Sequence, residues 1–410
     1  MSLTGSPIPC LNSSIALPAS KSISNRALII DALCETHLPI NNLAVCDDTD
    51  VLSQALCLDH HQIDVGAAGT AMRFLTAFLA RTSGTWLLTG SQRMKQRPIG
   101  LLVDALRELG AHITYVEKEG FPPLAIEGNA LLGGVITLQA DVSSQFVSAL
   151  MLLAPTFKQG LVIQLSGYIT SAPYIQLTAS VMAHYGVLVK LDGNAIIIPS
   201  QKYQSKPLLV EADWSAASYW YALLVVNRAG SFYLNGLNPQ SAQGDSKIVE
   251  LFAKFGVKTV FADNGVYLSY VGSDITHFNY NFSNEPDVAQ TFAVMCCMIG
   301  VTFHFTGLHT LKIKETDRLM ALTTELRKLG FSVLERADSE LLWDGQRVNY
   351  TPNPLIATYD DHRMAMAFAQ AAIKESLIIE NKQVVHKSYP QFWDEFQKIV
   401  KQINGVDITF

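Results

Sequence analysis

Residues 98–110 read PIGLLVDALRELG and run directly into AHITYVE at residues 111–117. Apolar residues recur at intervals of three and four in the first part, which is the pattern of an amphipathic helix. Gly110 follows the last apolar position, where a helix commonly ends on a glycine. Apolar and polar residues then alternate, as in a strand with one buried face. This stretch therefore predicts a helix, a glycine cap and a strand in succession.

The same succession returns three more times along the chain. Residues 174–186, 246–256 and 316–330 each form an amphipathic pattern that ends at a glycine and leads into a strand-like stretch. The four terminal glycines lie 70 to 76 residues apart. One such pattern means little, but four at a nearly constant spacing indicate a repeated β-α unit.

A second kind of helix precedes each of these, rich in small and apolar residues on all sides. Helices of this composition are buried ones. They begin at Ser20, Gly66, Ser143, Asp213, Glu285 and Asp360. Residues 50–58 and 390–403 supply amphipathic partners for the first and last of them, so the chain contains six helix pairs. Six pairs suit two domains of three, with the break near residues 206–213.

Composition sets the limits of what the chain can be. Its 410 residues, 49% hydrophobic and 16% charged, describe a globular protein of two large or three small domains and exclude disorder, coiled coil and collagen. The net charge of −6 argues against a broad nucleic-acid surface. The six cysteines form no C-x-x-C pair, so no metal site is indicated. Without a signal-peptide pattern or a membrane-length apolar stretch, we expect a cytoplasmic protein with no membrane partner.

Polar residues gather at the starts of the buried helices. A helix start offers unpaired N–H groups and a positive dipole, both suited to phosphate or carboxylate. Eleven of the 30 Lys and Arg residues lie at these starts or in three connections. Each group alone could be an N-cap with a surface cation. Together they predict a site for a small polyanionic substrate, formed by residues 20–26, 67–73, 93–97, 143–145, 312–318, 360–363 and 387.

Two acids stand among these cations. Asp287 and Glu315 would remain ionised there, as acceptance of a proton from a hydroxyl requires, although each could instead be a helix-capping residue. His362 could carry a proton, but we interpret it as a structural histidine. The chain has no G-x-x-x-x-G-K-[ST], G-x-G-x-x-G, H-E-x-x-H or G-x-S-x-G motif. Nucleotide, hydride, zinc and serine-hydrolase chemistry therefore lack support.

The motifs, taken together, resemble the 5-enolpyruvylshikimate-3-phosphate synthase family. KETDR with DHRMAM is specific to that family, whereas GTAMR is shared with other enolpyruvyl transferases. The motifs occur in the family's order and span nearly the whole chain: LPASKSISNRAL (17–28), GAAGTAMR (66–73), RMKQRPIG (93–100), SSQF (143–146), EPDVAQT (285–291), KETDRL (314–319) and DDHRMAM (360–366). The resemblance implies an α/β fold, a two-domain inside-out α/β barrel in which each domain has three βαβαββ units around buried helices. Residues 1–15 plus 213–410 would form domain I and residues 16–212 domain II.

The resemblance also implies an activity and a set of roles. The enolpyruvyl group of phosphoenolpyruvate would pass to the 5-hydroxyl of shikimate 3-phosphate through a tetrahedral adduct, with no metal or organic cofactor, in a monomer that closes on its substrates. Asp287 would take the hydroxyl proton, and Glu315 with Lys21 would protonate and deprotonate the methylene carbon. Phosphoenolpyruvate would be held by Lys21, Gly69, Arg97, Arg318, Arg363 and Lys387. Shikimate 3-phosphate would be held, besides Asp287, by Ser22, Arg26, Ser143, Ser144, Gln145, Ser171, Tyr174, Thr310 and Lys314.

Three positions depart from the common family pattern. Ala67, Phe74 and Thr310 stand where many members carry Asn, Pro and Asn, so the sequence does not predict the response to the herbicide glyphosate.

Two other functions are possible for a chain with these motifs. The sister enzyme acting on UDP-N-acetylglucosamine typically has a reactive cysteine in the loop corresponding to residues 90–98, and no cysteine occurs there. A non-catalytic anion-binding module on the same fold would be expected to lack the two acids.

Overall fold

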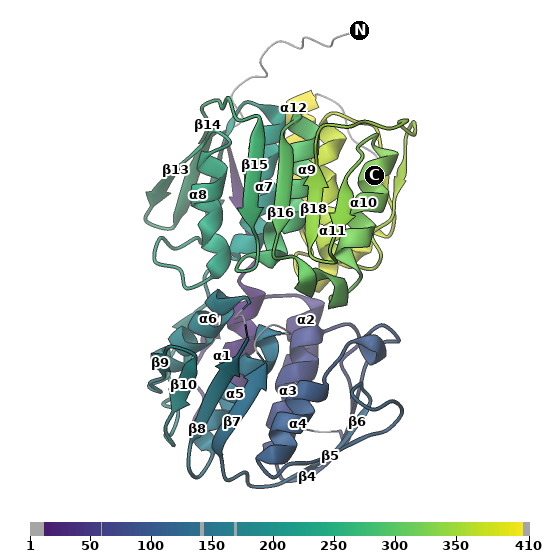
Figure 1. The fold of residues 1–410 in the computed structure, drawn as a ribbon. Coiled ribbons are helices and arrows are strands. Elements are labelled where there is room, and N and C mark those ends of the chain that lie inside the picture. Colours follow the sequence, from purple (N-terminus) through teal and green to yellow (C-terminus); the bar gives the residue numbers. More distant parts are fainter. Residues whose placement is uncertain (1–11, 59, 140–142, 168–169, 405–410) are drawn as a thin grey trace. The chain divides into compact units, whose positions relative to one another are not determined.

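The computed structural model describes residues 12–58, 60–139, 143–167 and 170–404, and its chain forms two compact units (Figure 1). One unit is continuous, Ser20–Val210, and the other joins the chain up to Ala19 with the chain from Glu211 onward. The changeovers fall at 19/20 and 210/211, where the sequence placed them at 15/16 and 212/213. Ala19 forms a β-bridge with Ala212. This bridge joins the two chain segments next to the changeovers, so both residues belong to the discontinuous unit. Residues 1–11 and 405–410 of the expected domain I lie outside the described residues.

The continuous unit shows the repeat in full in two of its sheets. In each, two parallel strands joined by a helix are followed by a second helix and an antiparallel hairpin, in the orders β3-β4-β6-β5 and β7-β8-β10-β9. The elements are β3 (Gln62–Asp64), α3 (Gly69–Arg81), β4 (Gly84–Thr89), α4 (Gly100–Glu108), β5 (His112–Tyr115), β6 (Leu124–Gly128), β7 (Gly134–Gln139), α5 (Ser144–Leu153), β8 (Leu161–Ser166), α6 (Ala172–His184), β9 (Lys190–Asp192) and β10 (Ala195–Ile198).

The third sheet of this unit consists of a single parallel pair. β11 (Leu208–Leu209) pairs with β2 (Ile40–Asn41), and the unit's helices here are α1 (Lys21–Leu33) and α2 (Asp47–Leu56). Only five residues separate the end of α2 from the start of β3. That connection is too short for a hairpin, because each hairpin strand alone needs several residues. The expected βαβαββ pattern therefore does not extend to this third sheet, which is a two-stranded parallel pair.

The discontinuous unit follows the same plan. Its four-stranded sheets have the orders β1-β12-β14-β13 and β15-β16-β18-β17, and its third is the parallel pair β19-β20. Figure 1 shows β15 and β16 side by side, with α9 next to them. The elements are β1 (Asn12–Ala16), α7 (Trp214–Asn227), β12 (Ser231–Asn235), α8 (Ile248–Ala253), β13 (Val257–Ala262), β14 (Gly265–Tyr270), β15 (His277–Asn281), α9 (Ala289–Ile299), β16 (Thr302–Thr306), α10 (Arg318–Lys328), β17 (Leu334–Arg336), β18 (Glu340–Trp343), β19 (Leu355–Ile356), α11 (His362–Ala369), β20 (Ile378–Ile379) and α12 (Phe392–Asn404).

Both helix classes expected from the sequence are present. The small-residue helices are the buried ones, as α7 shows: every residue from Ala216 to Val226 is buried. Gly110, Gly186, Gly256 and Gly330, which end the amphipathic helices, have φ angles of +97°, +83°, +80° and +84°. These left-handed conformations strain other residues but not glycine, so the predicted caps are confirmed. Among the described helices, none combines the length and the apolar character needed to cross a lipid bilayer.

Candidate active site

Five predicted residues of the discontinuous unit meet, four of them at or just before helix starts and one at the end of a turn, and we call them the acid–cation cluster: Asp287, Glu315, Arg318, Arg363 and Lys387. Asp287 lies in the short turn η4 (Pro286–Val288) immediately before α9. Arg318 is the first residue of α10 and Arg363 the second residue of α11. Lys387 ends the turn η7 (Lys382–Lys387). Separate helix starts thus bring together side chains that are distant in the sequence.

Arg318 is the centre of the cluster. Its side chain is 1% exposed and contacts three carboxylates. Nη1 donates to Oδ1 of Asp287 at 3.1 Å, Nη2 to Oε2 of Glu315 at 2.9 Å, and Nε to Oδ2 of Asp361 at 2.7 Å. Burial alone would lower the pKa of Arg318, but the three carboxylates outweigh it and raise the pKa. The planar fork of a guanidinium is suited to such multiple pairing.

Both acids are paired with cations. Arg363 Nη2 donates to Oδ2 of Asp287 at 2.9 Å, and Lys314 Nζ lies 3.8 Å from Oδ1 of the same carboxylate. Burial would raise the pKa of Asp287, yet the charges of Arg363, Lys314 and Arg318 prevail and hold that pKa well below its ordinary value. Glu315 pairs with Lys387, whose Nζ lies 3.1 Å from Oε1. The unit therefore presents two part-buried acids, each paired with cations, and the pKa of Asp287 is lowered by them.

In the continuous unit, Lys21 is the first residue of α1. Ser20 caps the helix by accepting from the amide of Ile23. Lys21 Nζ lies 2.8 Å from Oδ2 of Asp48, which is 4% exposed and belongs to the first turn of α2. The pairing fixes the end of a flexible side chain and keeps a positive charge at the start of α1.

Arg26 lies one turn further along α1, and the structure buries it to 3% exposure. Its guanidinium donates only to neutral oxygens: Oγ1 of Thr178 at 2.8 Å, Oγ of Ser148 at 3.0 Å and the carbonyl of Ser22 at 2.8 Å. Its Cζ lies 5.5 Å from the centre of the Phe74 ring. Burial lowers the pKa of Arg26 to about 10, and the nearby Tyr174 opposes this only in part. Among the described residues Arg26 has no carboxylate partner, and a buried cation in such surroundings would attract an anionic ligand.

Gly69 and Arg97 lie together at the start of α3. A Cβ atom on Gly69 would lie 2.6 Å from Nη1 of Arg97, so a side chain at this position would require the guanidinium to shift. Arg73 supports the arrangement, since it donates to the carbonyl of Gly69 at 3.2 Å and to that of Pro98 at 3.1 Å. The loop that carries Arg97 is thereby tied to the helix start, where N–H groups favour anions.

The remaining predicted residues of this unit lie at the starts of α5 and α6. Ser143 caps α5 by accepting from the amide of Gln145 at 3.3 Å, Ser144 is the first residue of that helix, and Gln145 donates to Oγ1 of Thr70 at 3.2 Å. Ser171 precedes α6 with φ +56°, a conformation that non-glycine residues adopt uncommonly and often at functional positions. The amide of Tyr174, on the first turn of α6, donates to the carbonyl of Ser171.

Two predicted ranges and one further acid supply positioning contacts. Thr310, predicted as a substrate contact, is buried in the turn η5 (His309–Ile313). Arg73 and Asp361, from the predicted ranges 67–73 and 360–363, hold Gly69 and Arg318. Asp48, which holds Lys21, was not singled out from the sequence. Asp48 could have been suspected from the acidic run at residues 47–50, since acids favour the first turn of a helix.

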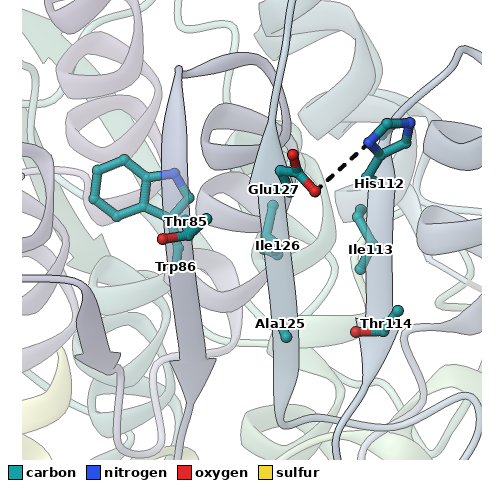
Figure 2. A pocket seen from close by; sticks show the side chains of 9 residues that line it. Thr85, Trp86, His112, Ile113, Thr114, Ala125, Ile126 and Glu127 are labelled. Atoms are coloured by element: carbon teal, nitrogen blue, oxygen red, sulfur yellow. Dashed lines mark ion pairs between the residues drawn. The ribbon is translucent and has the colours of Figure 1, made fainter.

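A separate hollow lies against β4, β5 and β6. It has a volume of about 460 Å³ and is lined by residues of these strands and by Ala111, none of them a predicted site residue. Figure 2 shows its one ion pair, between Nδ1 of His112 and Oε2 of Glu127 at 3.8 Å. Both of these side chains are exposed, so the pair is a surface contact of small energetic weight.

The arrangement defines an α/β barrel-type protein whose helix starts carry cations and two acids. The EPSP synthase (3-phosphoshikimate 1-carboxyvinyltransferase) family model matches residues 52–396. A 3-phosphoshikimate 1-carboxyvinyltransferase of Bacteroides fragilis is 50% identical over 390 residues, covering 95% of each chain. One from a Sulfurovum species is 36% identical over 428 residues, covering 97% of this chain and 99% of the relative. The chain belongs to the EPSP synthase family.

Solved structures agree on the fold. An EPSP synthase from Acinetobacter baumannii superposes with a TM-score of 0.73 over 98% of this chain and 96% of that one, at 19% sequence identity. The fold class predicted from the repeats and the resemblance is thereby confirmed.

Asp245 is a buried acid beside the cluster that the sequence did not single out. It lies in the turn η3 (Gly244–Lys247), is 4% exposed and accepts a hydrogen bond from the hydroxyl of Ser215 on α7. Burial and, to a lesser extent, the charge of Asp287 raise its pKa to about 7, against the lowering effect of Arg363. The folded protein therefore favours the neutral form of this carboxyl group.

We expect Asp245→Asn to change how stability depends on pH. Since the pKa of Asp245 rises from 3.8 to about 7 on folding, the stability that its neutral form contributes is complete below about pH 4 and is lost as the pH rises through about 7. The wild-type free energy of unfolding should fall, relative to Asp245→Asn, by on the order of 2–4 kcal/mol across that range. Urea unfolding at a series of pH values measures the difference. Parallel curves for the two proteins would contradict the expectation, and the exposed Asp274→Asn serves as control.

Proposed function

We propose that the protein transfers the enolpyruvyl group of phosphoenolpyruvate to the 5-hydroxyl of shikimate 3-phosphate and releases phosphate, a step of aromatic amino-acid biosynthesis. The observation that carries the proposal is the acid–cation cluster, in which Asp287 and Glu315 are paired with Arg318, Arg363 and Lys387. Membership of the EPSP synthase family supports the choice of substrates. Two anionic substrates need such a surplus of cations, because their mutual repulsion must be offset.

The continuous unit supplies further anion-binding groups in this proposal. Arg26 is a buried cation whose partners among the described residues are neutral oxygens. Together with Ser22 and the start of α5, it would bind an anionic group of shikimate 3-phosphate. Arg97, whose guanidinium lies against Gly69, would bind phosphoenolpyruvate beside the N–H groups at the start of α3. Lys21, fixed by Asp48, would provide a charge and a proton.

The pairing of the acids with cations would also let an acid of low pKa act as a base. Asp287 and Glu315 pair with the cations that would bind the phosphate and carboxylate groups of the substrates. When substrate anions take over those cations, the charges that depress the pKa of Asp287 are partly neutralised. The carboxylate then becomes a stronger base at the moment when a hydroxyl is present to give up its proton.

The proposed reaction runs by addition and elimination. Oxygen of the 5-hydroxyl forms a bond to C2 of phosphoenolpyruvate as Asp287 takes the hydroxyl proton, while Glu315 with Lys21 delivers a proton to C3 and makes it a methyl group. The adduct then loses phosphate as the bond between C2 and the phosphate oxygen breaks, while the new ether bond stays. The same pair removes a proton from the methyl group, which restores the double bond.

Phosphate release by the purified protein tests the proposal. The protein is mixed with phosphoenolpyruvate and either shikimate 3-phosphate or UDP-N-acetylglucosamine. We expect turnover with shikimate 3-phosphate alone. Turnover with the sugar nucleotide would assign the chain to the sister reaction, and binding of shikimate 3-phosphate without turnover would indicate a binding module.

The proposal extends to a monomeric, cytoplasmic enzyme that has no nucleic-acid partner. The net charge of −6 supports the last point. Sedimentation equilibrium of the purified chain, with and without added duplex DNA, checks the oligomeric state and the nucleic-acid point together. A dimer mass or co-sedimentation with the DNA would contradict the respective expectation.

A further inference from the structure

Glu325 on α10 is a carboxylate with no solvent exposure. Both of its oxygens are occupied: Oε2 accepts from Nζ of Lys328 at 2.6 Å and from the amide of Ala357 at 3.0 Å, and Oε1 accepts from the hydroxyl of Tyr359 at 2.8 Å. A buried carboxylate is costly unless donors surround it. Two of these donors belong to the segment that leads into α11, so Glu325 ties that segment to α10.

The tied segment contains an uncommon backbone turn. Tyr359 and Asp360 are consecutive non-glycine residues with φ of +55° and +53°. Such conformations persist only where surrounding contacts hold them, and they concentrate at functional sites. Oδ1 of Asp360 accepts from the side-chain amide of Asn381 at 2.8 Å, and Asn381 is itself left-handed with φ +43°. We call residues 357–360 with Glu325 and Asn381 the supporting turn.

The supporting turn connects to two cations of the acid–cation cluster through the backbone. Asp361, directly after the turn, caps α11 and accepts from Arg318, and Arg363 follows in the first turn of that helix. On the other side, Asn381 occupies the N-cap position of η7, which ends at Lys387. A shift of residues 357–360 would therefore move the start of α11 and the start of η7 together.

We propose that Glu325, Tyr359, Asp360 and Asn381 are positioning residues that set Arg363 and Lys387 for phosphoenolpyruvate. The inference rests on the proposed function and deepens it, since both cations are assigned to that substrate. These residues act through the turn and need not touch the substrate. Their loss therefore affects phosphoenolpyruvate more than shikimate 3-phosphate, part of whose assigned contacts come from α1, α5 and α6.

Tyr359→Phe tests the proposal in the full chain. It removes the hydroxyl donor from Glu325 and leaves the ring. We expect the KM for phosphoenolpyruvate to rise about tenfold, with the KM for shikimate 3-phosphate within about twofold of wild type. Tyr221→Phe is the matched control, because it removes a buried hydroxyl that pairs with Thr259 on β13. Equal losses of thermal stability in both variants, with wild-type kinetic constants in both, would overturn the proposal.

A pair of variants at Asp360 gives an independent check. Asp360→Asn keeps the acceptor for Asn381 and tolerates the left-handed conformation, whereas Asp360→Ala keeps neither. We expect Asn to retain the wild-type KM for phosphoenolpyruvate and Ala to raise it. Equal constants for the two variants would count against the role of Asp360.

Hydrogen exchange separates failure of this inference from failure of the proposed function. In Tyr359→Phe, amides of residues 361–369 and 382–389 should exchange about tenfold faster than in wild type, while those of α7 stay unchanged. This readout does not depend on any activity. An inactive wild type contradicts the proposed function, and unchanged exchange at these two segments contradicts the supporting turn.

Discussion

Glu315→Gln is expected to lower turnover by about 10²–10⁴-fold, the usual contribution of a proton-transferring side chain. The amide has the shape of the carboxylate but cannot carry a proton to and from carbon. Glu315 also lies between Arg318 and Lys387, so its loss leaves those cations without one shared counter-charge. Phosphate release under saturating substrates measures the effect.

The matched control for this variant is Glu340→Gln. Glu340 pairs with His304 on a sheet of the same unit and belongs to no helix start. It should keep the wild-type rate. If Glu315→Gln also kept a rate within about twofold of wild type while remaining folded, the carboxylate would have no part in proton transfer.

Arg318→Met is expected to destabilise the protein by about 3–5 kcal/mol, because it leaves buried carboxylates without their shared partner. Asp361 has no solvent exposure, and Arg318 supplies its side-chain ion pair across α10 and α11. Urea unfolding measures the free energy. Arg327→Met on the exposed side of the same helix should stay within about 0.5 kcal/mol of wild type. Equal stabilities for the two variants would show that the buried pairing contributes nothing net.

The repeat architecture could be predicted from the sequence because its signals are local. A glycine after an amphipathic stripe marks a helix end within one turn, and the four positive φ angles follow from that. The unequal third sheets could not be predicted from helix counting. They result from the length of single connections, such as the five residues between α2 and β3.

The sequence indicated the candidate members of the site more fully than the contacts among them. The sequence places Arg318 and Asp361 at two helix starts, but periodicity does not say that these starts meet, and 43 residues separate them. Arg26 looked like a cation at an open helix start. The register of α1 instead turns it toward Ser148 and Thr178, where it is buried.

The pairing of β1 with β12 has a consequence for the order in which the chain can fold during synthesis. Asn12 pairs with Ser231, and the whole of Ser20–Val210 lies between the two strands. The continuous unit can form its core as soon as it leaves the ribosome, while β1 waits as an unpaired strand. Only after β12 emerges can this sheet close, over a loop of the length that makes native contacts slow to form. The strand β1 is synthesised before the continuous unit, yet we expect it to acquire its structure after that unit has folded.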